Sequence, residues 1–77
     1  MARKAFQHHE AVSAVVPGEG GYRAAIAVKV LVDGGAPRFH KVLDGQRFSK
    51  AFEADEAASA ELERLRDVDA DGELVWA

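Results

Sequence analysis

The sequence predicts an α+β domain, an antiparallel β-meander of three to four strands with one amphipathic helix packed on one face and a short C-terminal strand or tail. Apolar residues alternate with period two over residues 22–33, and from residue 54 to 68 they recur every three or four positions. The 77 residues make one domain, 1–77, and chains of this size bury only about 60% of their unfolded surface. We therefore expect a thin core.

Each strand of the meander is bounded by turn-forming residues. Residues 11–16 alternate like the long strand, and the glycine-rich residues 17–21 join the two as a β-hairpin. Residues 34–37 turn the chain into a shorter strand at 38–43. The pair Asp44-Gly45 favours a tight turn, after which residues 46–50 are expected to form a fourth short strand.

The expected helix covers one face of this sheet and leaves the other face bare. Its apolar stripe consists of Ala54, Ala58, Leu62, Leu65 and Val68. Residues 74–76 are expected to form a short final strand or a packed tail, and removal of this segment should be costly because Trp76 is the largest apolar side chain. Alternation along the long strand turns four bulky residues toward the helix: Tyr22, Ile26, Val28 and Val30.

The opposite face carries Ala25, Ala27 and Leu31, which we take as a candidate dimer face. A wet sheet face normally carries charged or hydroxyl residues, so small apolar residues there indicate that another surface approaches. That surface is either the N-terminal segment around Phe6 or a second subunit. Exposed alanines on a monomer remain the alternative, because scattered apolar surface residues are normal.

Composition limits the classes of protein that remain. The 48% hydrophobic content is typical of a folded domain, and the absence of cysteine excludes a disulfide framework and a Cys-based zinc site. Residues 1–10 have no apolar signal segment, so we read them as mature sequence with room for flexibility. The most apolar segment, residues 24–32, contains Lys29 and is too short to span a membrane. These features predict a soluble, cytoplasmic protein with no membrane partner.

Charge is distributed unevenly along the chain. The net charge is -3, but residues 1–50 carry +4 and residues 51–77 carry -7. Such asymmetry can steer a partner, including a second copy of the chain, although an acidic helix beside a mildly basic sheet would produce the same counts.

The sequence contains no convincing catalytic or metal-binding motif. His8, His9 and Glu10 are adjacent on an extended segment, so their side chains point to opposite faces and cannot converge on one ion. His40 could act as a base for a serine, but no nucleophile elbow or phosphate-binding loop accompanies it. We therefore expect no enzyme activity, no metal and no cofactor.

A nucleic-acid site is the alternative function, because cations and an aromatic ring are interleaved in one region. The residues are Arg38, Phe39, His40, Lys41, Arg47 and Lys50. Two observations weaken this hypothesis. The chain is acidic, and Phe39 on a short strand is expected in the core.

The run from Gly45 to Ala57, which ends a meander in Phe52 and opens a helix with Glu53-Ala54, resembles the sheet-to-helix join of small uncharacterised bacterial domains. The β-β-β-α layout also resembles double-stranded-RNA-binding domains and antitoxin domains of the HicB type. The former have a leading helix and a lysine-rich start to the last helix, where this chain has Asp55 and Glu56. The resemblance implies a fold and carries over no functional residues.

These observations together predict a small non-enzymatic protein-interaction module. Its partner is expected to be a second copy of itself in a homodimer, or another protein. A weak nucleic-acid-binding domain that uses residues 38–50 is the alternative.

Overall fold

The computed structural model describes residues 2–31, 37–43 and 45–76, and within them the chain forms an α+β fold. Its elements are β1 (Arg3–Ala5), β2 (His9–Gly18), β3 (Gly21–Val30), β4 (Arg38–Lys41), α1 (Ala51–Arg64), β5 (Leu65–Val68) and β6 (Leu74–Trp76). Strands β1 to β4 form one antiparallel sheet in sequence order, here called the main sheet, and β5 pairs with β6 as a separate hairpin.

The hairpin of β2 and β3 is the longest pairing in the main sheet. It runs from His9 opposite Val30 to Gly18 opposite Gly21. The turn between the strands therefore consists of Glu19 and Gly20 alone, which is shorter than the predicted 17–21. Gly21 has a φ of 141°, and a β-carbon there would lie 2.5 Å from the backbone oxygen of Phe48. Glycine is therefore required where the hairpin meets the segment that precedes α1.

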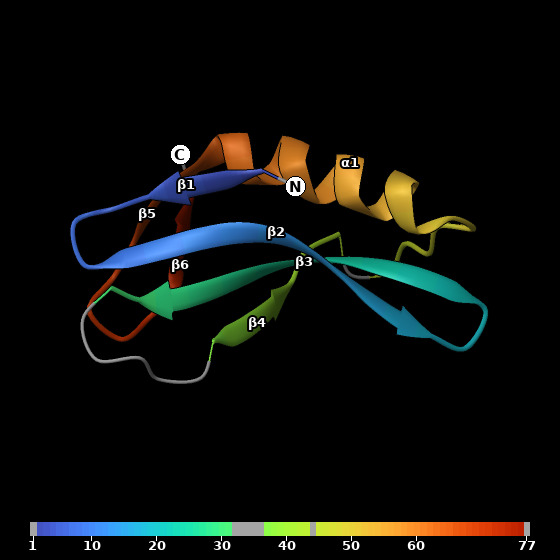
Figure 1. Ribbon diagram of the computed structural model, residues 1–77, viewed down its shortest axis with the longest axis horizontal. Coiled ribbons are helices and arrows are strands. Elements are labelled where there is room, and N and C mark those ends of the chain that lie inside the picture. Colours follow the sequence, from blue (N-terminus) through green and yellow to red (C-terminus); the bar gives the residue numbers. More distant parts are fainter. Residues whose placement is uncertain (1, 32–36, 44, 77) are drawn as a thin grey trace.

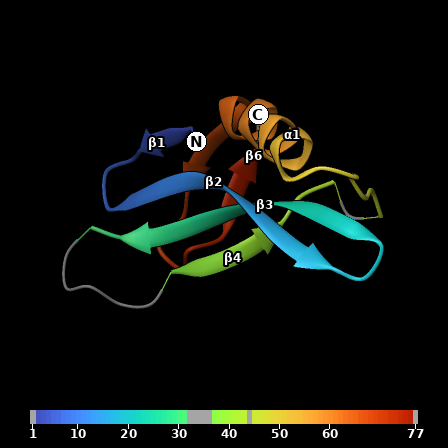
Figure 2. The same cartoon turned by 45° about the vertical axis from the view of Figure 1, so that its right-hand side comes forward.

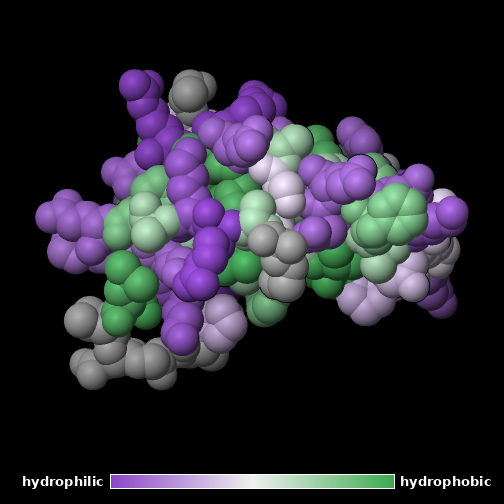
Figure 3. Space-filling model, turned by 45° about the horizontal axis from the view of Figure 1, so that its top comes forward, coloured by the Kyte–Doolittle hydropathy of each residue, from purple (hydrophilic) through white to green (hydrophobic). Residues whose placement is uncertain are grey.

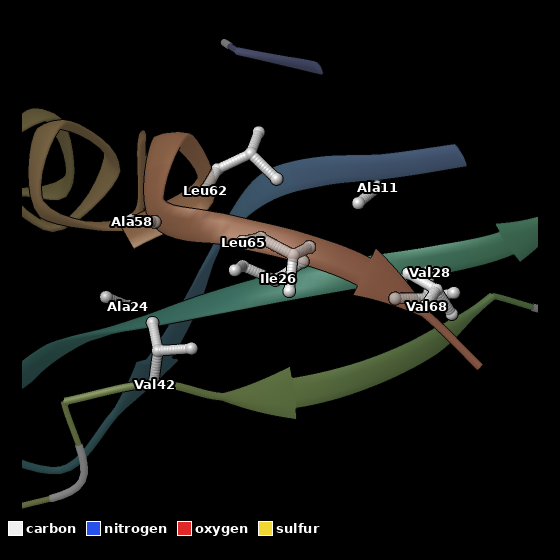
Figure 4. Packing of buried hydrophobic residues seen from close by; sticks show 9 residues of the cluster. All are labelled: Ala11, Ala24, Ile26, Val28, Val42, Ala58, Leu62, Leu65 and Val68. Carbon is white, nitrogen blue, oxygen red and sulfur yellow. The ribbon is translucent and has the colours of Figure 1, made fainter. Parts of the chain in front are cut away.

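Helix α1 and the hairpin β5–β6 lie on the same side of the main sheet. In Figure 1 the hairpin passes behind β2 and β3, and in Figure 2 β6 rises toward α1. The close-up in Figure 4 shows Leu65 and Val68 of β5 over Ile26 and Val28 of β3. The buried cluster is Ala11, Ala24, Ile26, Val28, Val42, Ala58, Leu62, Leu65 and Val68. The core therefore lies on one face of the main sheet, where α1 and β5 contribute side chains to it.

The helix is shifted toward the N-terminus relative to the predicted 54–68. It begins at Ala51 and ends at Arg64, and Leu65 is already extended, with φ -67° and ψ 124°. The ammonium group of Lys4 donates hydrogen bonds to the carbonyl oxygens of Glu63 (3.3 Å) and Leu65 (2.6 Å). This cation from β1 satisfies carbonyls that the helix end leaves without a partner.

The residues of the predicted apolar stripe are buried as expected, but its last two members do not belong to the helix. Leu65 and Val68 are both buried, at 1% and 7% exposure, but they belong to strand β5. The pairing with β6 contains an irregularity between Leu65 and Asp67. A bulge of this kind turns two residues three positions apart to the same side, which imitates the spacing of a helix.

The N-terminal segment and residues 46–50 differ from what the sequence predicts, and parts of two predicted turns lie outside the described residues. Residues 3–5, inside the segment given room for flexibility, form β1, and Phe6 packs against the core cluster rather than over the bare sheet face. Phe48 makes an isolated bridge with Tyr22, and no strand is formed at residues 46–50. The predicted turn at 34–37, except Pro37, and Asp44 lie outside the described residues.

Candidate interaction face

The face of the main sheet that points away from α1 is the candidate functional site, and we call it the open face. Among residues 2–31, 37–43 and 45–76, no helix or strand covers it, because α1 and the hairpin β5–β6 both pack on the other side. Strand register and the alternation of side chains assign its members. They are Arg3, Ala5, Glu10, Val12, Ala14, Val16, Arg23, Ala25, Ala27, Lys29, Phe39 and Lys41.

Small apolar side chains form the centre of the open face. Val12 lies opposite Ala27, and Ala14 lies opposite Ala25, so two neighbouring pairs across β2 and β3 present little more than methyl groups. Ala25 is fully buried between Ala14 and Lys41, whereas Ala27 is half-buried. The accessible part of this floor is therefore Val12, Ala14 and Ala27, whose short side chains let a flat group approach the backbone.

Charged side chains surround this floor. They are Arg3, Glu10, Arg23, Lys29 and Lys41, and they give the open face a formal charge of +3. Arg3 forms an ion pair with Glu10, and Lys29 lies directly opposite Glu10. Because the whole chain has a net charge of -3, the rest of the chain carries -6. The open face is therefore the basic side of an acidic protein.

The acidic residues gather on the helix side. Helix α1 carries Glu53, Asp55, Glu56, Glu61 and Glu63, of which Glu56 and Glu63 are exposed. In the space-filling view that brings α1 and β1 forward, purple hydrophilic side chains project across the surface, with green hydrophobic residues visible between them (Figure 3). The two sides of the sheet thus differ in charge as the two halves of the sequence do.

Phe39 was expected in the core, and this expectation is wrong. Its side chain is 58% exposed and lies on the open face, opposite Ala27. Its strand neighbours on the same face include Lys41, two residues along β4. The physical reason is the phase of the short strand: Arg38 and His40, not Phe39, point toward the hairpin β5–β6.

The six residues of the predicted nucleic-acid site do not form one surface. Arg38 donates a hydrogen bond to the backbone oxygen of Asp71 (2.7 Å) and lies 3.8 Å from the carboxylate of Glu73. The Nδ1 atom of His40 lies 4.0 Å from that carboxylate. The side chains of Arg38 and His40 therefore contact the hairpin β5–β6. Of the six residues, only Phe39 and Lys41 belong to the open face.

Arg47 and Lys50 lie elsewhere in the structure. The guanidinium of Arg47 lies over Gly20 at the turn between β2 and β3. Lys50 immediately precedes α1, and its ammonium is 5.6 Å from the ring centre of Phe52. Sequence proximity therefore grouped residues that the fold separates.

Two of the three candidate dimer residues lie on the same open face. Ala25 and Ala27 lie on it, and Leu31 follows the end of β3 with 52% of its surface exposed. Sequence reasoning missed Arg3, Val12 and Ala14, which reach this face from β1 and β2. The alternation of residues 11–16 contained that information, but the pairing register was needed to use it.

The residues considered for metal binding and catalysis are dispersed. His9 is buried on the core side and Glu10 lies on the open face. In the described part of the chain, no three His, Asp or Glu side chains are grouped as metal ligands would be. The hydroxyls of Ser13 and Ser49 donate to Asp55 and Glu53, at 2.8 and 3.0 Å, so neither is positioned on His40.

A second feature is a depression of about 430 Å³ between β4, α1 and β6, lined by His40, Glu61, Glu73 and Trp76 among others. The Nε2 atom of His40 is buried without a hydrogen-bond partner. The side chain of His40 retains 17% exposure, and both carboxylates already contact arginines, Glu61 with Arg64 and Glu73 with Arg38. Among the polar groups named, only the Nε2 atom of His40 has no partner, so the depression is not a ligand-binding site that these groups form together.

Comparison with known proteins supplies no relative: no protein-family model, no curated protein and no solved structure matches the chain. Within the described residues, no helix has the length and apolar content to cross a membrane.

Proposed function

We propose that this protein is a non-enzymatic interaction module that binds nucleic acid through the open face. The observation that supports the proposal most is the charge of that face, +3 on a protein whose net charge is -3. Lys29 and Lys41 lie on it together with Arg23, around a floor of small apolar residues. Phosphates are bound by such cations, and the neighbouring flat apolar floor accommodates sugars and bases.

The acidic net charge does not prevent this binding, because the negative charge lies on the other side. The molecule measures 35 × 25 × 19 Å. At physiological ionic strength, charges are screened over about 8 Å, which is less than the thickness of the domain. A polyanion at the open face therefore experiences mainly the local cations, and the acidic helix side favours its approach from one direction.

The experiment compares neutralisation of the face with an equal loss of charge elsewhere. The variant Lys29→Gln/Lys41→Gln is expected to lose most of its affinity for a fluorescein-labelled oligothymidylate of about 20 nucleotides, measured by fluorescence anisotropy. The control Lys50→Gln/Arg66→Gln removes two exposed cations outside the open face and should bind like the parent. Equal losses in both variants, or no binding by the parent at low salt, would contradict the proposal.

The number of phosphate contacts sets how strongly the affinity for nucleic acid should depend on salt concentration. If Lys29 and Lys41 each neutralise one phosphate, the logarithm of affinity falls with the logarithm of salt at a slope of about -1.4 for a single strand. Between about 50 and 200 mM salt, the affinity then falls about sevenfold. A salt-independent affinity would show that cations do not make the contact.

Self-association through the same face is the second candidate, and the alanine floor is the observation that favours it. A two-fold contact would place Ala27 of both copies together, where short side chains let the sheets approach. We expect Ala27→Arg to split such a dimer in sedimentation equilibrium at tens of micromolar. A monomeric parent would remove this candidate, and a dimer unaffected by the change would place the interface at a strand edge.

A further inference from the structure

We infer that the open face binds single-stranded nucleic acid with one base stacked on Phe39, an inference that rests on the nucleic-acid binding proposed above. Phe39 combines three properties that a stacking residue needs. Its ring is 58% exposed, it lies on the uncovered side of the sheet, and Lys41 follows two positions along the same strand. Successive residues on one face of a strand are about 7 Å apart.

The surroundings of Phe39 leave space for a flat group. Directly opposite on β3 is Ala27, and the row continues through Val12 on β2 to Arg3 on β1. No long side chain stands between the ring and the centre of the face in this row. A base that lies on the ring would therefore rest against the methyl group of Ala27.

Exposure alone does not distinguish Phe39, because Phe52 is also 58% exposed. Phe52, however, belongs to α1 on the acidic side, and the ammonium of Lys50 already lies 5.6 Å from its ring centre. Phe39 lies instead among the cations of the open face, with Lys41 placed to contact the phosphate next to a stacked base. The two phenylalanines form a matched pair for experiment.

The geometry favours a single strand over a duplex. Bases within a duplex already stack on one another, so a protein ring can stack only on bases that are unpaired. The ring then accepts any base, because each base has a flat aromatic face. We expect little sequence preference and a modest affinity, since one ring and the two cations Lys29 and Lys41 make the contact.

The test uses the intact protein with labelled oligothymidylate of about 20 nucleotides and a duplex of the same length. Phe39→Leu, which keeps an apolar side chain without the ring, should weaken single-strand binding by between about fivefold and a hundredfold. Phe39→Tyr should restore most of the affinity, and Phe52→Leu should leave it unchanged. Because Phe39 is exposed, thermal melting of Phe39→Leu should match that of the parent.

The outcomes separate this inference from the proposal on which it rests. If Lys29→Gln/Lys41→Gln loses binding but Phe39→Leu does not, and the duplex binds as tightly as the single strand, stacking is refuted and binding through the cations stands. If Phe52→Leu weakens binding as much as Phe39→Leu, the ring contact lies outside the open face and the inference fails. If neither nucleic acid binds the parent, both are wrong.

Discussion

The substitution Leu62→Ala measures how far this thin core depends on the contact between α1 and the main sheet. Leu62 is 2% exposed and is the largest buried side chain of the helix. Truncation of a buried leucine costs about 3 kcal/mol or more, because transfer energy is lost and a cavity remains. A chain of this length is expected to have a free energy of unfolding of about 4 to 12 kcal/mol. The variant therefore loses between a quarter and most of its stability.

Thermal melting followed by circular dichroism provides the assay. For a domain of this size, each kcal/mol shifts the Tm by about 4 to 8 °C, so Leu62→Ala should lower the Tm by about 12 to 24 °C. Phe52→Ala truncates a larger, exposed side chain of the same helix and should change the Tm by less than about 4 °C. Leu62→Asp should leave the domain unfolded at room temperature. Equal melting of the parent and Leu62→Ala would refute the packing described for α1.

Three further predictions concern the backbone and the polar contacts that fix the layers. Gly21→Ala should lower the Tm strongly, because the added β-carbon would lie 2.5 Å from the backbone oxygen of Phe48, whereas Gly18→Ala meets nothing within 4 Å and should melt like the parent. Ser13→Ala should cost about 1 to 3 kcal/mol in chemical denaturation, because the fully buried hydroxyl donates to Asp55 and accepts from the amide of Ala2. Lys4→Met should loosen the end of α1, visible as faster hydrogen exchange in the last helical turn, since its ammonium binds two carbonyls there.

Local pattern was sufficient to predict most of the fold. The alternation at residues 11–16 and 22–33 predicted β2 and β3, and the glycines between them predicted their turn. The three-to-four spacing identified Ala54, Ala58 and Leu62 as the buried helix positions. These predictions succeeded because each depended on neighbours within a few positions in the chain.

The failures arose where distant parts of the chain decide the structure. The carbonyl oxygens at the end of α1 accept hydrogen bonds from Lys4 of β1, some 60 positions away, which no local pattern reveals. Leu65 and Val68 continue the helical spacing but pair with β6 through an irregular register. Short strands are also ambiguous in phase, so the face on which Phe39 lies could not be predicted from four residues.

The composition of the candidate site also depends on contacts between distant parts of the chain, so the sequence identified it only in part. The sequence placed Ala25 and Ala27 on the sheet face opposite the helix, which agrees with the register, but it did not reveal that Ala25 is fully buried there. It identified Phe39 and Lys41 as candidates for binding nucleic acid but grouped them with Arg38, which instead contacts Asp71 and Glu73. The two sets of candidates, for a dimer and for nucleic acid, are brought onto one surface by the pairing of β3 with β4.

Because both candidate partners use one surface, the sign of the salt effect should distinguish them. A two-fold contact between open faces brings together two surfaces of charge +3, so added salt screens their repulsion and should strengthen the dimer. Nucleic-acid binding should instead weaken as salt rises. Sedimentation equilibrium and anisotropy on the same samples, at about 50 and 200 mM salt, would measure both. A dimer that dissociates as salt rises would show that surfaces of opposite charge meet. The open face of one copy would then contact the acidic helix side of another. This result would rule out the two-fold contact through Ala27.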